Sequence, residues 1–209
     1  MTEAAPATHG SGVLIVLAGA SGVGKGTVRE AALPAVAPVS FSVSATTRAR
    51  RPHEVEGRDY FFKTQDAFDA MVEQDALLEW AEYVGDRYGT PREPVDAALA
   101  RGEDMLLEVD LEGARQIKRR KPEAVTVFLV PPSLAELERR LRERGTDSEE
   151  KIQKRLRRAE QEIAALQEFD YVIVNDVLNE AVTAFQSVVR AERLRSSRWT
   201  DARVAQLLP

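Results

Sequence analysis

The sequence contains no cysteine, and its only histidines are His9 and His53. The missing cysteine excludes a disulfide scaffold, a thiol nucleophile and a zinc site with thiolate ligands. No apolar run reaches the roughly 18 residues that a membrane-spanning helix requires. The first residues also lack the basic and apolar segments of a secretion signal. We therefore expect a cytoplasmic protein that does not bind a membrane.

The sequence also has no excess of basic residues. The chain has 29 Lys and Arg residues against 34 Asp and Glu residues, which gives a net charge of −5 and argues against a nucleic-acid-binding protein. Its 209 residues, 44% of them apolar, fit one compact unit with an inserted lobe. Arginine supplies 23 of the 29 basic residues. This bias reflects either overall composition or arginine side chains that bind phosphate in pairs of hydrogen bonds.

Apolar runs of strand length alternate with helical patterns along most of the chain. This alternation predicts an α/β fold with a parallel sheet. The helix near residue 27 is predicted to end before Pro34, because proline interrupts a helix interior. The predicted buried strands are residues 13–18, 105–109, 125–130 and 171–174, and the predicted helices include residues 27–32, 114–120, 147–167 and 180–195.

Residues 41–93 interrupt this alternation. They contain shorter apolar and aromatic segments and are predicted to form an insertion. The pattern predicts strands at residues 41–46, 60–62 and 77–83, a helix at 64–73 and a loop at 85–91.

A glycine-rich segment follows the first predicted strand and opens a helix, which is the context of a P-loop. Its backbone N–H groups and the helix N-terminus are expected to bind phosphate oxygens, and its lysine side chain to reach the outer phosphates of ATP. The candidate ATP-binding residues are Gly19, Ala20, Ser21, Gly22, Val23, Gly24, Lys25, Gly26 and Thr27.

The P-loop departs from the general pattern at one position. Gly26 stands where a hydroxyl residue usually follows the lysine, and Thr27 comes next, a variant typical of nucleoside monophosphate kinases. A direct bond from Thr27 to Mg²⁺ is therefore left open. Asp110, at the end of a buried strand, is the other candidate metal residue, partly through water, and is equally interpretable as the N-cap of the next helix.

A second group of chemically suited residues lies within the insertion. The series runs Ser44, Thr46, Thr47, Arg48, Arg51, Glu54, Gly57, Asp59 and Tyr60, and continues with Glu79 and with Tyr88-Gly89-Thr90. Together with the P-loop, it resembles guanylate kinase of the bacterial type, within the nucleoside monophosphate kinase family. The resemblance extends from residue 13 to about residue 195.

The resemblance implies a fold and a domain division. The expected fold is α/β, with a three-layer P-loop NTPase core and parallel sheet, an inserted mixed α+β GMP-binding lobe and a helical lid. The core comprises residues 12–40, 94–133 and 169–198, the GMP lobe 41–93 and the lid 134–168. Residues 1–11 are expected to be a disordered lead-in and residues 199–209 a C-terminal tail.

The resemblance also implies transfer of the ATP γ-phosphoryl group to GMP or dGMP, with Mg²⁺ as cofactor, in purine nucleotide metabolism. It assigns the guanine to Ser44, Glu79 and Thr90. Guanine offers two adjacent donors that one carboxylate can accept, whereas adenine would present a lone pair to it. The GMP phosphate is assigned to Arg48, Arg51, Tyr60 and Tyr88, of which Tyr60 is alternatively a core residue. Glu108 is expected to line the GMP site in a role that stays open.

No general base is required, because the attacking oxygen of the GMP phosphate is already anionic. Catalysis then consists of positioning and charge stabilisation. The resemblance assigns this role to Lys25, Arg48, Arg144 and Arg155, and places Asn175 beside the adenine. The alternatives are an adenylate-type or other small-acceptor kinase, and a non-catalytic guanylate-kinase-like binding domain. The sequence does not indicate the oligomeric state.

Overall fold

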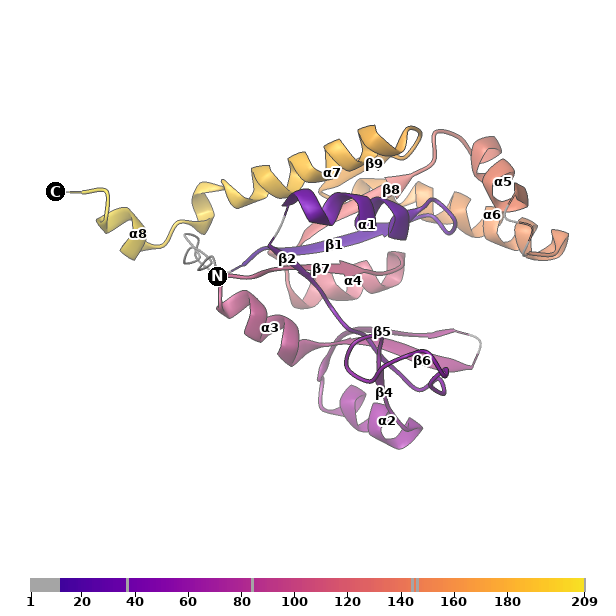
Figure 1. The fold of residues 1–209 in the computed structure, drawn as a ribbon, viewed down its shortest axis with the longest axis horizontal. Coiled ribbons are helices and arrows are strands. Elements are labelled where there is room, and N and C mark those ends of the chain that lie inside the picture. Colours follow the sequence, from indigo (N-terminus) through magenta and orange to yellow (C-terminus); the bar gives the residue numbers. More distant parts are fainter. Residues whose placement is uncertain (1–11, 37, 84, 144, 146, 209) are drawn as a thin grey trace.

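The computed structural model describes residues 12–208 apart from residues 37, 84, 144 and 146, so the predicted lead-in lies outside the described residues. A five-stranded parallel sheet forms the centre of the molecule, in the order β2-β7-β1-β8-β9 (Figure 1). These strands are β1 (Leu14–Gly19), β2 (Val39–Phe41), β7 (Asp104–Glu108), β8 (Val125–Val130) and β9 (Tyr171–Val174).

Helices cover both faces of this sheet, which produces three layers (Figure 1). Alternate residues of β1 point to opposite faces, as the period of a strand requires. Ile15 and Leu17 pack in the same cluster as α1 and α7, whereas Leu14 and Val16 pack in the cluster of α3 and α4. The bounds are α1 (Lys25–Val36), α3 (Arg92–Ala100), α4 (Leu111–Arg120) and α7 (Leu178–Arg193). The predicted α/β fold with a parallel sheet is confirmed.

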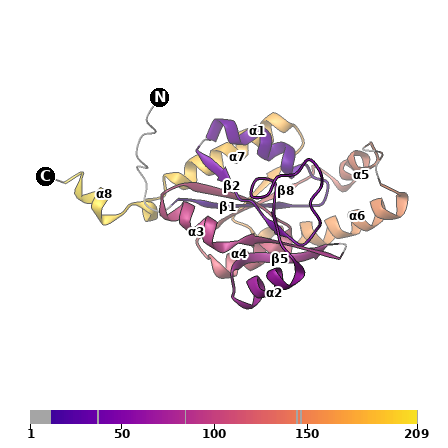
Figure 2. The same ribbon diagram turned by 60° about the horizontal axis from the view of Figure 1, so that its bottom comes forward.

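A smaller four-stranded sheet has the order β4-β3-β6-β5. Phe68 of α2 is fully buried against this sheet, with its ring centroid 6.4 Å from that of Trp80. Figure 2, with this side brought forward, shows α2 beside β5. The elements are β3 (Ala45–Thr46), β4 (Phe61–Phe62), α2 (Gln65–Glu73), β5 (Leu77–Tyr83) and β6 (Asp86–Pro91).

The remaining helices lie at opposite ends of the molecule (Figure 1). At one end are α5 (Leu134–Glu143) and α6 (Glu149–Ala164), followed by the short helix η1 (Leu166–Glu168). At the other end, η2 (Ser196–Arg198) and α8 (Asp201–Ala205) form the C-terminal segment. Among the described residues, none of these helices has the length and apolar character needed to cross a membrane.

Three local predictions from the sequence are wrong. α1 continues through Pro34, which is exposed near the end of the helix, because Ala32 and Val36 on either side of it are buried. Residues 41–46 are not one strand, since the chain passes there from the first sheet to the second. Residues 85–91 are not a loop: Gly85, with φ of +81°, forms a turn, and β6 then pairs antiparallel with β5. The boundaries proposed for core, lobe and lid stay predictions.

Candidate active site

The glycine-rich segment connects β1 to α1 at the carboxyl end of the parallel sheet, where α/β proteins bind ligands. Gly22 and Gly24 have φ values of +92° and +95°, which glycine adopts readily. The Lys25 ammonium donates to the Gly19 carbonyl oxygen at 2.9 Å. Burial lowers the pKa of Lys25, and neighbouring carboxylates, Glu108 foremost, oppose that shift. A cation thus lies against a loop that can bind phosphate.

A cavity of about 400 Å³ lies beside this loop. Asn175 connects its two sides, since its Nδ2 donates to the Val23 carbonyl at 2.7 Å while its own carbonyl accepts from Arg140 at 2.7 Å. The structure therefore brings Asn175 and the loop together, and a place for Asn175 beside the adenine stays a prediction. The cavity is lined by Gly22, Val23, Gly24, Thr27, Arg140, Glu143, Asn175, Asp176 and Leu178.

Asp110 is the N-cap of α4, because its Oδ1 accepts from the Gly113 N–H at 2.9 Å. Its Oδ2 accepts from Arg158 at 2.8 Å. Within the described part of the chain, no three His, Asp or Glu side chains cluster as a complete metal site. By residue type, a hydroxyl and a carboxylate suit Mg²⁺, which is usually bound by few protein ligands together with water and substrate phosphates, but Thr27 lines the cavity beside the loop and Asp110 does not.

In the second sheet, Glu79 and Thr90 are register partners on β5 and β6, and both are buried. The Thr90 hydroxyl donates to Glu79 Oε1 at 2.6 Å. Burial raises the pKa of Glu79 to about 7, although the hydrogen bonds from Thr90 oppose the shift. A buried carboxylate is a suitable acceptor for N–H groups of a ligand.

Arg48 lies in an aromatic and acidic cluster on the same sheet. It donates to Glu54 Oε1 at 2.7 Å, and its guanidinium carbon lies 5.4 Å from the centroid of the Tyr60 ring. The rings of Tyr60 and Tyr88 meet edge to face at 6.1 Å. Glu54 also accepts from the Arg51 backbone N–H, and these hydrogen bonds, that of Arg48 first, lower its pKa to about 2. The four predicted phosphate-binding residues are therefore neighbours.

A cavity of about 240 Å³ contains Ser44, Tyr60 and Glu108 among its lining residues. Arg29 lines it too and forms an ion pair with Glu108 at 3.0 Å. Sequence reasoning missed Arg29, yet its position four residues after Lys25 places both on one face of α1, which is a usable signal. The structure thus brings Glu108 beside the predicted GMP residues.

The roles predicted for Arg144 and Arg155 of the lid stay predictions. Arg144 lies outside the described residues. Arg155 forms an ion pair with Asp147 at 3.1 Å. Two other residues of α6 approach the loop instead: Glu162 accepts from the Ser21 N–H at 3.1 Å, and Arg158 donates to Glu162 at 2.8 Å. Sequence reasoning did not select this pair among the many charges of α6.

The loop can bind the phosphates of a nucleoside triphosphate, and the arginine and tyrosine cluster of the second sheet can bind an anionic acceptor. Fold and site together define the class of the molecule as a P-loop phosphotransferase.

Comparisons with known proteins identify the family. The guanylate kinase family model matches residues 11–192. A guanylate kinase of Thermus thermophilus is 58% identical over 191 residues, which cover 91% of this chain and 86% of the relative. That of Desulfitobacterium hafniense is 49% identical over 187 residues, covering 90% and 94%. The crystal structure of guanylate kinase from Anaplasma phagocytophilum matches with a TM-score of 0.74 and 32% identity over 96% of each chain. The chain belongs to the guanylate kinase family.

Proposed function

We propose that the two sheets of this chain divide the reaction between them, with ATP bound by the phosphate loop and GMP by the second sheet. As a guanylate kinase, the chain transfers the γ-phosphoryl group of ATP to GMP, and the products are ADP and GDP. The observation that carries the division is the buried pair of Glu79 and Thr90, joined by a hydrogen bond of 2.6 Å, on a sheet separate from the loop.

Selection of guanine is assigned to Glu79, Thr90 and Ser44. The carboxylate of Glu79 accepts from N1–H and from the exocyclic amine, Thr90 supports the amine, and Ser44 donates to O6. Adenine has an acceptor at N1 and would leave the buried carboxylate unpaired. Such a mismatch costs roughly 1–3 kcal/mol of binding free energy, and specificity follows from the polar groups left without partners.

The GMP phosphate is assigned to Arg48, Arg51, Tyr60 and Tyr88. Arg48 is held by Glu54, which orients the guanidinium for the proposed phosphate contact. Two guanidinium groups and two phenol hydroxyls supply the donors that a phosphate dianion requires. Glu108 lines the same region.

The ATP phosphates are assigned to the loop of residues 19–27, with Lys25 reaching the outer phosphates and Asn175 lying toward the adenine. Lys25, Arg48, Arg144 and Arg155 are the proposed catalytic residues. They act by positioning the two nucleotides in line and by stabilising charge on the transferred group. Mg²⁺ would be held by Thr27 and Asp110, partly through water, and supplies charge neutralisation between the phosphates.

We also propose a second acceptor, a metabolic role and a cellular location for the chain. Use of dGMP as a second acceptor, a place in purine nucleotide metabolism and a cytoplasmic location are consistent with membership of this family.

The first experiment measures ADP formation from ATP and Mg²⁺ with GMP, dGMP, AMP, UMP or CMP as acceptor. We expect fast turnover with GMP and weaker turnover with dGMP. Turnover with AMP instead would mean that the acceptor site is wrongly assigned. Binding of GMP without any turnover would indicate a non-catalytic binding domain.

Removal of the loop lysine tests the assignment of the phosphate loop. Lys25→Ala should lower kcat at least about 100-fold, a loss typical of removing one donor to developing charge. Lys154→Ala is the matched control, because Lys154 is exposed on α6. A Lys25→Ala protein that keeps most of its activity would contradict the assignment.

A further inference from the structure

A continuous chain of hydrogen bonds connects the phosphate loop to the N-terminus of α4 through α6. The Ser21 N–H donates to Glu162 Oε2 at 3.1 Å, and Arg158 Nε donates to Glu162 Oε1 at 2.8 Å. Nη2 of the same guanidinium donates to Asp110 Oδ2 at 2.8 Å, while Asp110 Oδ1 accepts from the Gly113 N–H. The loop, α6 and α4 are thereby joined by two side chains of α6.

Glu162 is far more buried than Arg158. Only 6% of the Glu162 side chain is exposed, compared with 49% of the Arg158 side chain. A buried carboxylate is stable only when its oxygens have partners, and here the Ser21 N–H and Arg158 supply them. Glu162 is therefore fixed in place, and it fixes the first turn of the loop from the side of α6.

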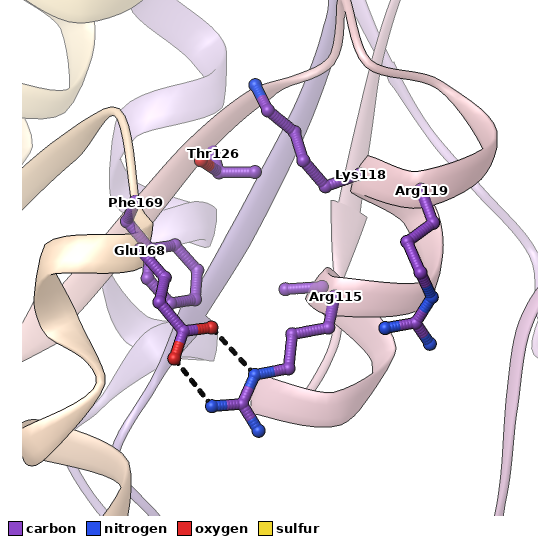
Figure 3. Close-up of a pocket in the computed structure, with 7 residues that line it drawn as sticks. Arg115, Lys118, Arg119, Thr126, Glu168 and Phe169 are labelled. Carbon is purple, nitrogen blue, oxygen red and sulfur yellow. Dashed lines mark hydrogen bonds and ion pairs between the residues drawn. The ribbon is translucent and has the colours of Figure 1, made fainter.

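A second contact holds the end of α6 against α4. Arg115 of α4 forms two hydrogen bonds with Glu168 of η1, at 2.7 and 2.6 Å (Figure 3). They lie at a cavity of about 400 Å³ that is also lined by Lys118, Arg119 and Phe169. α6 and η1 are thus attached to α4 at Asp110 and again at Arg115, so the C-terminal half of α6 is held against the core.

We propose that Glu162 and Arg158 are positioning residues for phosphoryl transfer, which set the phosphate loop relative to Asp110. The inference rests on the proposed function, in which the loop binds ATP and Asp110 supports Mg²⁺. Glu162 acts through the Ser21 backbone, and Arg158 acts through Glu162 and Asp110. An error of about 1 Å in such an alignment can reduce the rate 100-fold.

The geometry of Arg158 distinguishes this role from that of a simple positive charge. Its planar group donates to two carboxylates from two nitrogens, Nε to Glu162 and Nη2 to Asp110, which the single ammonium group of lysine does not reproduce. A residue that only contributed positive charge near the phosphates would be replaceable by lysine. A residue that holds Glu162 and Asp110 at a fixed separation is not.

The first test compares Glu162→Gln with Glu162→Ala. Glutamine keeps an oxygen that can accept from the Ser21 N–H, whereas alanine removes it. We expect Glu162→Ala to lower kcat/KM for ATP by about 10- to 100-fold, and Glu162→Gln by about threefold. KM for GMP should stay within about twofold of wild type in both variants, because the second sheet is not altered.

The second test compares Arg158→Gln, Arg158→Lys and the control Arg157→Gln. Arg157 is an exposed neighbour on α6, so its variant makes the same change of charge away from the two carboxylates. We expect Arg158→Gln and Arg158→Lys to lower kcat/KM for ATP about tenfold each. The Arg157→Gln protein should match wild type.

Ligand-induced stabilisation supplies a measurement that does not depend on turnover. The increase in Tm on adding ADP should shrink in Glu162→Ala and Arg158→Gln, while the increase on adding GMP should equal that of wild type. Equal losses for ADP and GMP would show a general structural defect and overturn the proposal. Restoration of activity by Arg158→Lys would overturn the bridging role.

Failure of the proposed function and failure of the positioning role would give different results. If wild type phosphorylated no nucleotide, the proposed function would be wrong, and the ADP-induced increase in Tm would still test the positioning pair. If wild type phosphorylated GMP and the Arg158→Gln protein behaved like Arg157→Gln, the proposed function would stand and the positioning pair would be rejected.

Discussion

The role proposed for Glu79 in guanine selection requires the burial of a charged group. Its carboxyl group has a hydrogen bond from Thr90, but burial still raises its pKa from the usual 4.5 to about 7. Between these pH values the folded chain binds a proton that the unfolded chain does not. Stability therefore falls as the pH rises through this window, and is constant above it. In the proposed site, GMP is bound by the ionised form of Glu79, whose burial is unfavourable when no ligand N–H group pairs with it.

Replacement of Glu79 by glutamine tests this linkage. Glu79→Gln should remove the decrease in unfolding free energy between pH 5 and 8 that we attribute to this group, up to about 3 kcal/mol. The measurement is urea denaturation without nucleotides across that range. Glu82→Gln, an exposed position on the same strand, is the control and should keep the wild-type slope. An unchanged slope in Glu79→Gln would show that another group titrates.

At the scale of elements, α2 begins at a side-chain cap. Thr64 has an extended backbone, and its hydroxyl accepts from the Ala67 N–H at 3.2 Å. Thr64→Ala should lower the free energy of unfolding by about 1 kcal/mol, as measured by urea denaturation. Thr64→Ser keeps the hydroxyl and should lose less. Equal losses in the two variants would mean that the methyl group, rather than the cap, stabilises the helix.

The elements show which parts of the fold can be predicted from sequence. Strands 77–83, 125–130 and 171–174 have the predicted bounds, because local apolar and aromatic residues indicate each of them in the sequence. β6 was missed because Gly85, Gly89 and Pro91 are typical of loops. Gly85 forms the turn before β6, whereas Gly89 and Pro91 are register partners of Trp80 and Leu77 on β5. A Cβ on Gly89 would lie 2.8 Å from the Glu79 carbonyl oxygen, so glycine is required there by the neighbouring strand.

In the site, too, local patterns predicted some residues, whereas others depend on how the elements pack. The loop residues were predicted from a motif with characteristic spacing, and Glu79 and Thr90 from a family resemblance. The pairing of Glu79 with Thr90 across β5 and β6 was not predicted. Glu162 and Arg158 lie among many charges on α6, where spacing of four residues predicts only local ion pairs. Their contacts with Ser21 and Asp110 depend on how α6 packs against β1 and α4, which a local pattern does not encode.

At the scale of the whole molecule, the two sheets must keep a fixed relation if two nucleotides are to meet in line. Gln116 of α4 joins them, since its amide donates to the Trp80 carbonyl at 3.0 Å and accepts from the Trp80 N–H at 3.2 Å. β5 is an edge strand of its sheet, and this side chain pairs with that edge as a neighbouring strand would. Trp80 follows Glu79, so α4 helps to position the carboxylate that we propose as the guanine-binding group from outside the second sheet.

Removal of this side chain should therefore affect the two substrates unequally. Gln116→Ala leaves the Trp80 N–H and carbonyl without these partners, which should lower the free energy of unfolding by roughly 1–3 kcal/mol. KM for GMP should rise several-fold, while KM for ATP stays near wild type, because the loop lies on the first sheet. Initial rates with one nucleotide saturating give both constants, and Arg119→Gln on the same helix is the control. If stability fell while both KM values stayed unchanged, Gln116 would support the sheet without positioning Glu79.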